Sequence, residues 1–139
     1  MSAEVRLEKL LQNIDPQLQG EVYDFVTMPE AQLRDLLGES LCIFREREGI
    51  SAIVPRAVAE REGLVTDADG GGYRQITLQV HSSLQAVGLT AAVAGELAAE
   101  GISANVVAAL RHDHVFVPER HAQRALQILR GIGNRAQYS

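Results

Sequence analysis

Apolar residues near the start of the chain recur with the spacing of a helix. Leu7, Leu10, Leu11 and Ile14 fall on one helical face, and Pro16 ends the run because proline interrupts a helix interior. The pattern predicts an amphipathic helix that packs against another element or covers a sheet edge.

After this helix, the same order of residues occurs three times: a short apolar strand, a proline, a helical stretch and a glycine. Proline suits a helix start because its missing N–H had no partner there, and glycine ends a helix by adopting positive φ. The pattern therefore predicts strands followed by helices with well-marked ends. The three copies are Tyr23–Thr27 with Pro29 and Gly38, Ala52–Val54 with Pro55 and Gly63, and Val115–Val117 with Pro118 and Gly131.

Two of these copies also follow a predicted β-hairpin, in FREREGISAIVP and in LRHDHVFVP. A strand and a helix precede each hairpin as well, so that a βαββα unit occurs twice. This order predicts an α+β fold of two ferredoxin-like units in tandem, each with its helices on one face of an antiparallel sheet. The preceding elements are expected at Val22–Thr27 and Glu30–Leu37, then at Gln75–His81 and Thr90–Glu100.

The fourth strand of each unit has a weak signal in the sequence. Only Leu64–Thr66 is available in the first copy and Asn134–Ser139 in the second, so we expect the units to share or exchange strands. Ile102–Leu110 carries little charge and is predicted to lie in the middle of its sheet. The expected segments are an N-terminal helix in 1–16, a first unit at 17–69 and a second unit at 70–139, with a flexible turn at Gly70–Gly72.

Composition and charge exclude some classes of protein and argue against some functions. Hydrophobic residues make up 46% and charged residues 22%, which is ordinary for a globular protein and excludes a disordered chain. The net charge of −5, with bases interleaved among acids, argues against binding to nucleic acid or to an anionic membrane. Cys42 is the only cysteine and lies in an apolar run, so no intramolecular disulfide is expected. No signal peptide or spanning segment is present, which favours the cytoplasm.

The segment His81–Ala92 contains the most unusual polar residues of the chain. It joins a strand to a helix through a loop in which Gly88 permits close approach of a ligand to the backbone. Free N–H groups at the helix start form an anion site that suits a carboxylate. The alternative is a loop in which Ser82 and Ser83 hydrogen-bond their own backbone, and the sequence leaves both open.

A second polar cluster, His112-Asp113-His114, lies at the turn of the second predicted hairpin. In a ferredoxin-like sheet this turn shares an end with the loop after the first strand, so the clusters are expected to meet. Asp113 suits a ligand ammonium. Two further interpretations stay open: a metal site formed with His81, and a cluster that only caps the hairpin.

Catalytic motifs are absent from the sequence. It contains no nucleophile elbow, no paired-carboxylate motif and no complete phosphate-binding loop, since Gly70–Gly72 lacks the following Lys-Ser/Thr. We therefore predict a protein that is not an enzyme and that uses no cofactor and no metal.

The strand QITLQVH, the segment SSLQAVGLTAAVAGELAAEGIS and the hairpin NVVAALRHDHVFVP together resemble a tandem ACT-domain protein. The resemblance is to short bacterial ACT-domain proteins, covers nearly the whole chain and is strongest from Tyr73 to Gly131. The second unit is similar to the regulatory ACT repeats of aspartate kinases. The HDH turn replaces a Thr-Asp-Tyr-like sequence of those repeats and retains Asp113.

The resemblance implies ACT-type βαββαβ units, ligand binding between units, and an amino acid as ligand. It also implies a regulatory protein that pairs its units internally or as a homodimer. The alternative is a protein–protein interaction module with a vestigial site. The implied ligand-contact residues are His81, Ser82, Ser83, Val87, Gly88, Leu89, Asn105, His112, Asp113 and His114.

Overall fold

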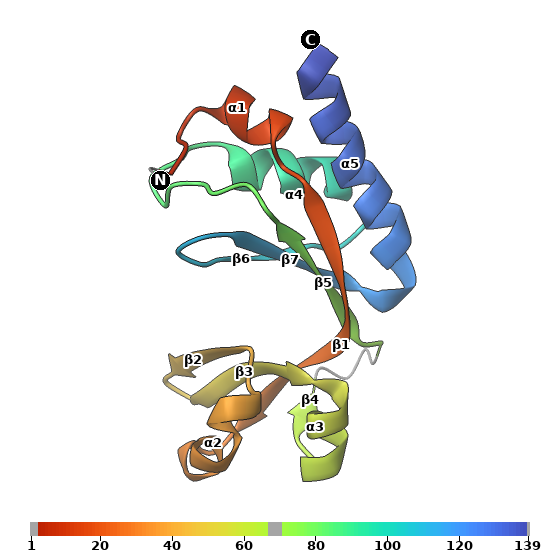
Figure 1. The fold of residues 1–139 in the computed structure, drawn as a ribbon. Coiled ribbons are helices and arrows are strands. Elements are labelled where there is room, and N and C mark those ends of the chain that lie inside the picture. Colours follow the sequence, from red (N-terminus) through yellow and green to blue (C-terminus); the bar gives the residue numbers. More distant parts are fainter. Residues whose placement is uncertain (1–2, 67–70, 139) are drawn as a thin grey trace. The chain divides into compact units, whose positions relative to one another are not determined.

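The computed structural model describes residues 3–66 and 71–138 (Figure 1). The chain forms two compact units, which we call the split unit, residues 1–20 with 74–139, and the inner unit, residues 21–73. The expected segments 1–16, 17–69 and 70–139 are thus grouped differently, because the N-terminal residues pack with the second half of the chain. Of the predicted turn at Gly70–Gly72, Gly70 lies outside the described residues.

The split unit is one sheet with helices on one face. Its strands lie in the order β1–β5–β7–β6, where only the first residues of β1 belong to this unit. Figure 1 shows α1, α4 and α5 gathered on the same side of these strands. The elements are α1 (Leu7–Gln12), β1 (Pro16–Met28), β5 (Tyr73–Leu78), α4 (Leu89–Ala99), β6 (Asn105–Ala108), β7 (Asp113–Pro118), a short 3₁₀ turn η2 (Glu119–His121) and α5 (Ala122–Tyr138).

The core of the split unit lies between the sheet and the three helices. Strand side chains alternate between faces, so β5 and β7 each present every second residue to the helices. Burying such side chains contributes roughly 1.5–3 kcal/mol each. The core includes Ile76 and Leu78 of β5, Val115 and Val117 of β7, Val93 and Leu97 of α4, Leu126 and Leu129 of α5, and Leu10 of α1.

Helix α1 confirms the amphipathic helix predicted from the apolar spacing. Leu10 is fully buried and Ile14 almost so, and α1 packs against both α4 and α5. The approach to α5 is close at Gly133, where an added Cβ would lie 3.2 Å from Cγ2 of Ile14. The helix is therefore an integral part of the split unit.

The strands of the inner unit lie in the order β2–β3–β1–β4, and β1 also belongs to the sheet of the split unit. The pairs β1–β3, β1–β4 and β2–β3 are all antiparallel, with Asp24 of β1 opposite Val54 of β3. Val26 and Met28 of β1 face a core closed by Leu33 and Leu36. The elements are α2 (Glu30–Leu36), η1 (Leu37–Glu39), β2 (Cys42–Glu46), β3 (Gly49–Pro55), α3 (Arg56–Glu62) and β4 (Val65–Thr66).

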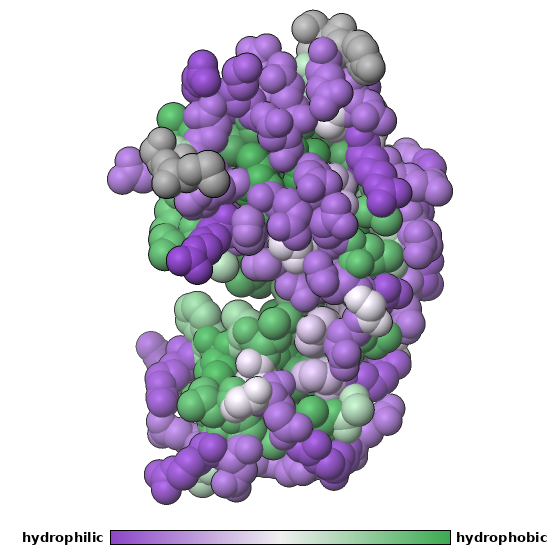
Figure 2. Space-filling model, in the orientation of Figure 1, coloured by the Kyte–Doolittle hydropathy of each residue, from purple (hydrophilic) through white to green (hydrophobic). Residues whose placement is uncertain are grey.

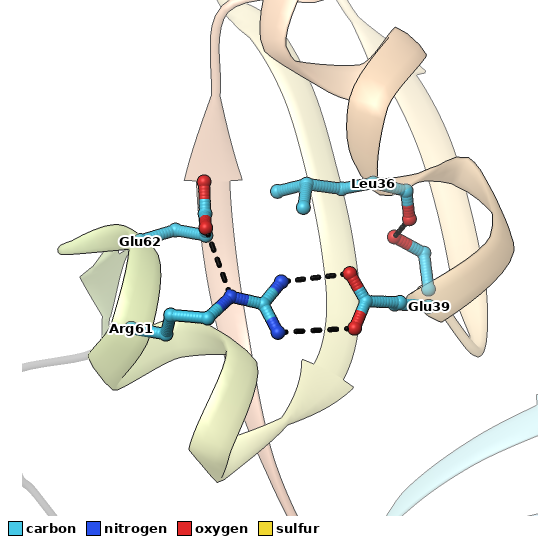
Figure 3. A network of polar contacts seen from close by, with 5 residues as sticks. Leu36, Glu39, Arg61 and Glu62 are labelled. Atoms are coloured by element: carbon cyan, nitrogen blue, oxygen red, sulfur yellow. Dashed lines mark hydrogen bonds and ion pairs between the residues drawn. The ribbon is translucent and has the colours of Figure 1, made fainter.

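A polar network joins α3 to η1 in the inner unit (Figure 3). The Arg61 guanidinium donates two hydrogen bonds to the Glu39 carboxylate, at 3.1 and 2.7 Å, and a third to Glu62 at 2.9 Å. The bonds from Arg61 hold the pKa of Glu39 below its usual value. Because these side chains are exposed, the network orients α3 and η1 more than it stabilises them.

The proline and glycine signals locate most helix boundaries correctly. Pro29, Pro55 and Pro118 immediately precede helical segments, with φ of −63°, −55° and −54°. Gly63 ends α3 in the left-handed conformation, with φ of 61°. These positions confirm three strand-to-helix junctions.

Gly131, in contrast, does not end the last helix. Helix α5 continues to Tyr138, because Ile132 and Gly133 beyond the glycine are buried and tertiary packing outweighs the intrinsic cost of a helical glycine. The expected strand at Asn134–Ser139 is therefore wrong as far as Tyr138. Among the described residues, no helix combines the length and apolar content needed to cross a bilayer.

The two units share strand β1, which is one of the two arrangements that the weak signals predicted. Val65–Thr66 pairs with β1 in the inner unit, and the first residues of β1 fill the fourth position beside β5 in the split unit. The prediction that Ile102–Leu110 is a central strand is wrong: only Asn105–Ala108 is strand, and it lies at the edge. The low charge of the segment has another cause, since Ile102 belongs to the helix-side core before the strand begins.

Candidate ligand-binding site

The loop of residues 79–88 and the β6–β7 turn are joined at one end of the split unit. The Ser82 hydroxyl donates a hydrogen bond of 3.0 Å to Oδ2 of Asp113, and both residues are buried, with exposed fractions of 6% and 8%. Nδ1 of His112 lies 3.4 Å from the Val80 carbonyl oxygen, which can only accept. The structure therefore brings together the two polar clusters that the topology predicted would meet.

The N-terminal segment also holds this loop. The Glu4 N–H donates to the His81 carbonyl at 3.0 Å, and the Ser83 N–H donates to the Glu4 carbonyl at 2.9 Å, which forms a parallel bridge. Sequence reasoning missed Glu4, since no local pattern indicates a pairing between residues so far apart. The loop is thus fixed on two sides.

The two serines of the loop have different roles. The Ser83 hydroxyl accepts from the Gln85 N–H at 3.0 Å, and its carbonyl accepts from the Ala86 N–H at the same distance. This is the local backbone bonding that the sequence left open as an alternative. Ser82 instead bonds across to β7, so the alternative describes Ser83 only.

The loop leads into the N-terminus of α4. Gly88 adopts φ of 102°, which glycine tolerates, and an added Cβ would lie 3.1 Å from a methyl group of Leu7. Leu89 is buried in the core, so that its backbone N–H, and not its side chain, is available to a ligand. Val87 is 83% exposed. The first turn of α4 contains no acidic residue, so its unpaired N–H groups are not neutralised.

Asn105 and His114 lie away from the Ser82–Asp113 pair. Asn105 begins β6 opposite Phe116, whereas Asp113 is opposite Ala108 at the turn end of the hairpin. Nδ1 of His114 lies 3.0 Å from Nε2 of Gln75 and 3.1 Å from Oγ1 of Thr77.

Sequence reasoning missed these two partners of His114. Gln75 and Thr77 are buried and alternate along β5 with core residues Ile76 and Leu78, so they occupy the sheet face opposite the helices. That alternation of polar and apolar positions is the signal that could have found them.

The contacts of His114 favour the neutral imidazole. Burial lowers the pKa of His114, and the nearby His112 lowers it further, while Asp113 partly opposes both effects. The Gln75 amide donates to Nδ1 when that nitrogen carries no proton, which places the ring proton on Nε2. Protonation of His114 is therefore coupled to unfolding.

We expect the free energy of unfolding to fall as the pH drops below about 6.5, the value for histidine in an unfolded chain. The unfolded state then binds a proton that the folded state resists until the lower folded pKa is reached. Denaturant unfolding at a series of pH values measures the slope. His114→Gln should flatten the slope; equal slopes in the wild type and His114→Gln would contradict the assignment.

The metal interpretation of the three histidines is not supported by the geometry. Within residues 3–66 and 71–138, no group of three or more histidine, cysteine or carboxylate side chains is placed to hold a metal ion. His114 contacts Gln75 and Thr77 instead, and His112 faces the Val80 carbonyl.

The chain belongs to the ACT-domain family. ACT-domain family models match residues 2–69 and residues 71–131, which together span most of the chain. The match confirms the resemblance and the predicted α+β fold of two ferredoxin-like units. ACT domains are regulatory domains and not catalytic ones, and the assignment supports a regulatory, small-ligand-binding role. None of the curated proteins compared gives a significant match.

Solved structures agree with this assignment. A Vibrio cholerae protein described as of unknown function and as a possible transport protein is 44% identical, with a TM-score of 0.80 over 91% of this chain and 95% of its own. The ligand-free regulatory subunit of Thermus thermophilus aspartate kinase is 12% identical, with a TM-score of 0.66 over 86% and 97%. An Agrobacterium tumefaciens protein is 15% identical, with a TM-score of 0.61 over 85% and 87%. The last two share the fold.

Proposed function

We propose that the chain is a non-catalytic regulatory protein that binds an amino acid at the loop 79–88 and the start of β7. The bond between Ser82 and Asp113 carries this proposal, because it holds a buried carboxylate beside the loop that leads into α4. The ligand ammonium would pair with Oδ1 of Asp113, which accepts no hydrogen bond from the described residues. The ligand carboxylate would bind the N–H groups of α4.

The remaining residues would supply the walls of the site and its pairing with a second copy. Leu84, Val87 and Leu110 are large apolar residues that are exposed in the loop and the turn. We propose that they contact a second ACT unit in a cytoplasmic homodimer, with the amino acid bound beside them. Of the contacts inferred from the family, those proposed here are His81, Ser82, Ser83, Val87, Gly88, Leu89, His112 and Asp113. Asn105 and His114 lie away from the Ser82–Asp113 pair and are left out of the proposed site.

A thermal-unfolding scan against each proteinogenic amino acid tests this proposal. A ligand present at about 100 times its dissociation constant adds roughly 2.7 kcal/mol to the free energy of unfolding, which raises the midpoint by several degrees. We expect one amino acid, or a few related ones, to raise the midpoint, and a chelator to leave that rise unchanged. Absence of any rise would contradict amino-acid binding.

Asp113→Asn then tests the site itself. Asparagine keeps an oxygen that can accept from Ser82, so the fold should persist while the charge that holds the ammonium is lost. We expect affinity for the identified amino acid to fall about tenfold or more, as calorimetry would measure. Asp35→Asn, which removes the same charge from an exposed position in α2, is the matched control and should bind as the wild type does.

The second candidate function is a protein–protein interaction module with a vestigial site. It is favoured by the mutual bonding of Ser82 and Asp113 and by the exposed apolar side chains of Leu84 and Val87. This candidate predicts a stable protein partner and no response to amino acids. A response lost in Asp113→Asn would exclude it.

A further inference from the structure

A second concave surface of the split unit lies between α1, the turn into β1, the beginning of the loop 79–88 and the end of α5. It is an open cleft of about 760 Å³, and every residue that lines it belongs to the split unit. Of the proposed amino-acid contacts it includes only His81. Its volume is in the range of small-molecule sites.

The lining of this cleft is rich in side-chain amides. Figure 2 shows mostly hydrophilic side chains on the visible surface where α1 and the end of α5 lie. Amides of Gln12 and Gln137 donate to backbone carbonyls across the α1–α5 contact and so form the wall. The side chains of Gln79 and Asn134 form no hydrogen bond within the described ranges, which leaves their donors and acceptors for a ligand.

The uncompensated charge in the cleft is positive. Lys9 and Arg130 line it, and neither forms an ion pair or a hydrogen bond through its side chain with residues 3–66 or 71–138. Of the two acidic side chains of the lining, Glu4 is paired with Arg6, whereas Asp15 accepts from the neutral Gln17 amide at 2.8 Å and keeps its negative charge. Lys9 and Arg130 together outweigh Asp15, so the cleft keeps one positive charge in excess. Two unpaired cations in one cleft stand out in a chain of net charge −5.

The backbone is strained at the edge of the same cleft. Asp15 has φ of 38°, the only positive φ of a non-glycine residue among those described, and its carbonyl accepts from the Gln79 N–H at 3.2 Å. Residues other than glycine rarely adopt such a conformation, which persists where the surroundings impose it, often at binding sites. Here it turns the chain from α1 into β1 and thereby shapes one wall of the cleft.

We propose that this cleft binds a small organic anion, whose charged oxygens pair with Lys9 and Arg130 while its other polar groups bond Gln79 and Asn134. Carboxylate and phosphate oxygens share the required chemistry, since both accept charge-assisted hydrogen bonds from arginine and lysine. The cleft is built by the N-terminal helix and the extended end of α5, and its occupancy is independent of the amino-acid site at Asp113.

Calorimetric titration of the whole chain tests the proposal with succinate, glucose 6-phosphate and inorganic phosphate as probes, and with glucose as a neutral control at matched ionic strength. We expect at least one anion to bind and glucose not to bind. Succinate alone would assign a carboxylate, and either phosphate alone would assign a phosphoryl group. No heat at concentrations that saturate a Kd of about 1 mM would overturn the proposal.

Matched charge variants locate the binding. Arg130→Gln and Lys9→Gln should each lower the affinity for the bound anion about tenfold, and Asn134→Ala should lower it less. Arg124→Gln removes the same charge from a residue that pairs with Glu100 outside the cleft, and should bind normally. Equal weakening in Arg124→Gln would show a general charge effect and overturn the site.

Asp113→Asn separates this inference from the proposed amino-acid function. It should leave anion binding unchanged while it weakens amino-acid binding. If Asp113→Asn lost anion binding while Arg130→Gln kept it, the anion would bind at the amino-acid site, and the proposal that it binds in the cleft would be wrong.

Discussion

Replacing Leu10 with alanine is expected to lower the free energy of unfolding by about 2–5 kcal/mol. Leu10 is the fully buried residue of α1, with an exposed fraction of 0%, and it belongs to the core formed by α4, α5 and the sheet. Truncation removes apolar contacts and leaves a cavity that neighbouring helices fill only in part. Denaturant unfolding followed by circular dichroism measures the loss.

Leu37→Ala is the matched control for this change. Leu37 lies in η1 of the inner unit and is 60% exposed, so its truncation should change the free energy of unfolding by no more than about 0.5 kcal/mol. If Leu10→Ala behaved like the control, α1 would not be part of the core.

Gly72→Ala is expected to destabilise the inner unit by about 1–3 kcal/mol. A Cβ at this position would lie 2.3 Å from Cγ1 of Val22 and 3.2 Å from Cζ of Arg56. The guanidinium of Arg56 is held by two hydrogen bonds to Asp24, each 3.2 Å, so it cannot move without breaking them. Equilibrium unfolding of the variant measures this steric cost.

A double-mutant cycle tests whether the steric cause is right. Val22→Ala removes the methyl group that the new Cβ would meet, so the double variant should recover part of the stability lost in Gly72→Ala. Gly38→Ala, at a glycine with no heavy atom within 4 Å of an added Cβ, is the control and should cost much less. Additive losses in the cycle would contradict the proposed clash.

Local sequence patterns predicted those parts of the fold that local chemistry determines. The amphipathic spacing of Leu7 to Ile14 and the junctions at Pro29, Pro55 and Pro118 depend on residues within one or two turns, and each has its counterpart in the structure. The predictions of the end of α5 and of the position of β6 were wrong, because both features depend on tertiary neighbours. Gly131 would end a helix only if no residue beyond it packed against the core. Ile132, the next residue, is buried, so the helix continues.

The contacts of the candidate site likewise divide into those that the sequence predicted and those that only the structure shows. The meeting of Ser82 with Asp113 followed from topology, since one sheet end holds both the loop and the turn. The partners of His114 depend on which face of β5 carries Gln75 and Thr77, and the bridge from Glu4 to the loop depends on a pairing between distant segments. No local pattern encodes such contacts, so they could be found only in the structure.

The division of the split unit between two distant parts of the sequence has a consequence for the order in which the two units fold during synthesis. Translation delivers residues 3–20 before the inner unit and α5 after it. When α1 and the start of β1 emerge from the ribosome, β5, α4 and α5 do not yet exist, whereas the inner unit has its whole sequence available much earlier. Contacts between distant parts of a chain also form slowly, because a long loop must close first. The unit whose first residues are synthesised earliest is therefore completed last.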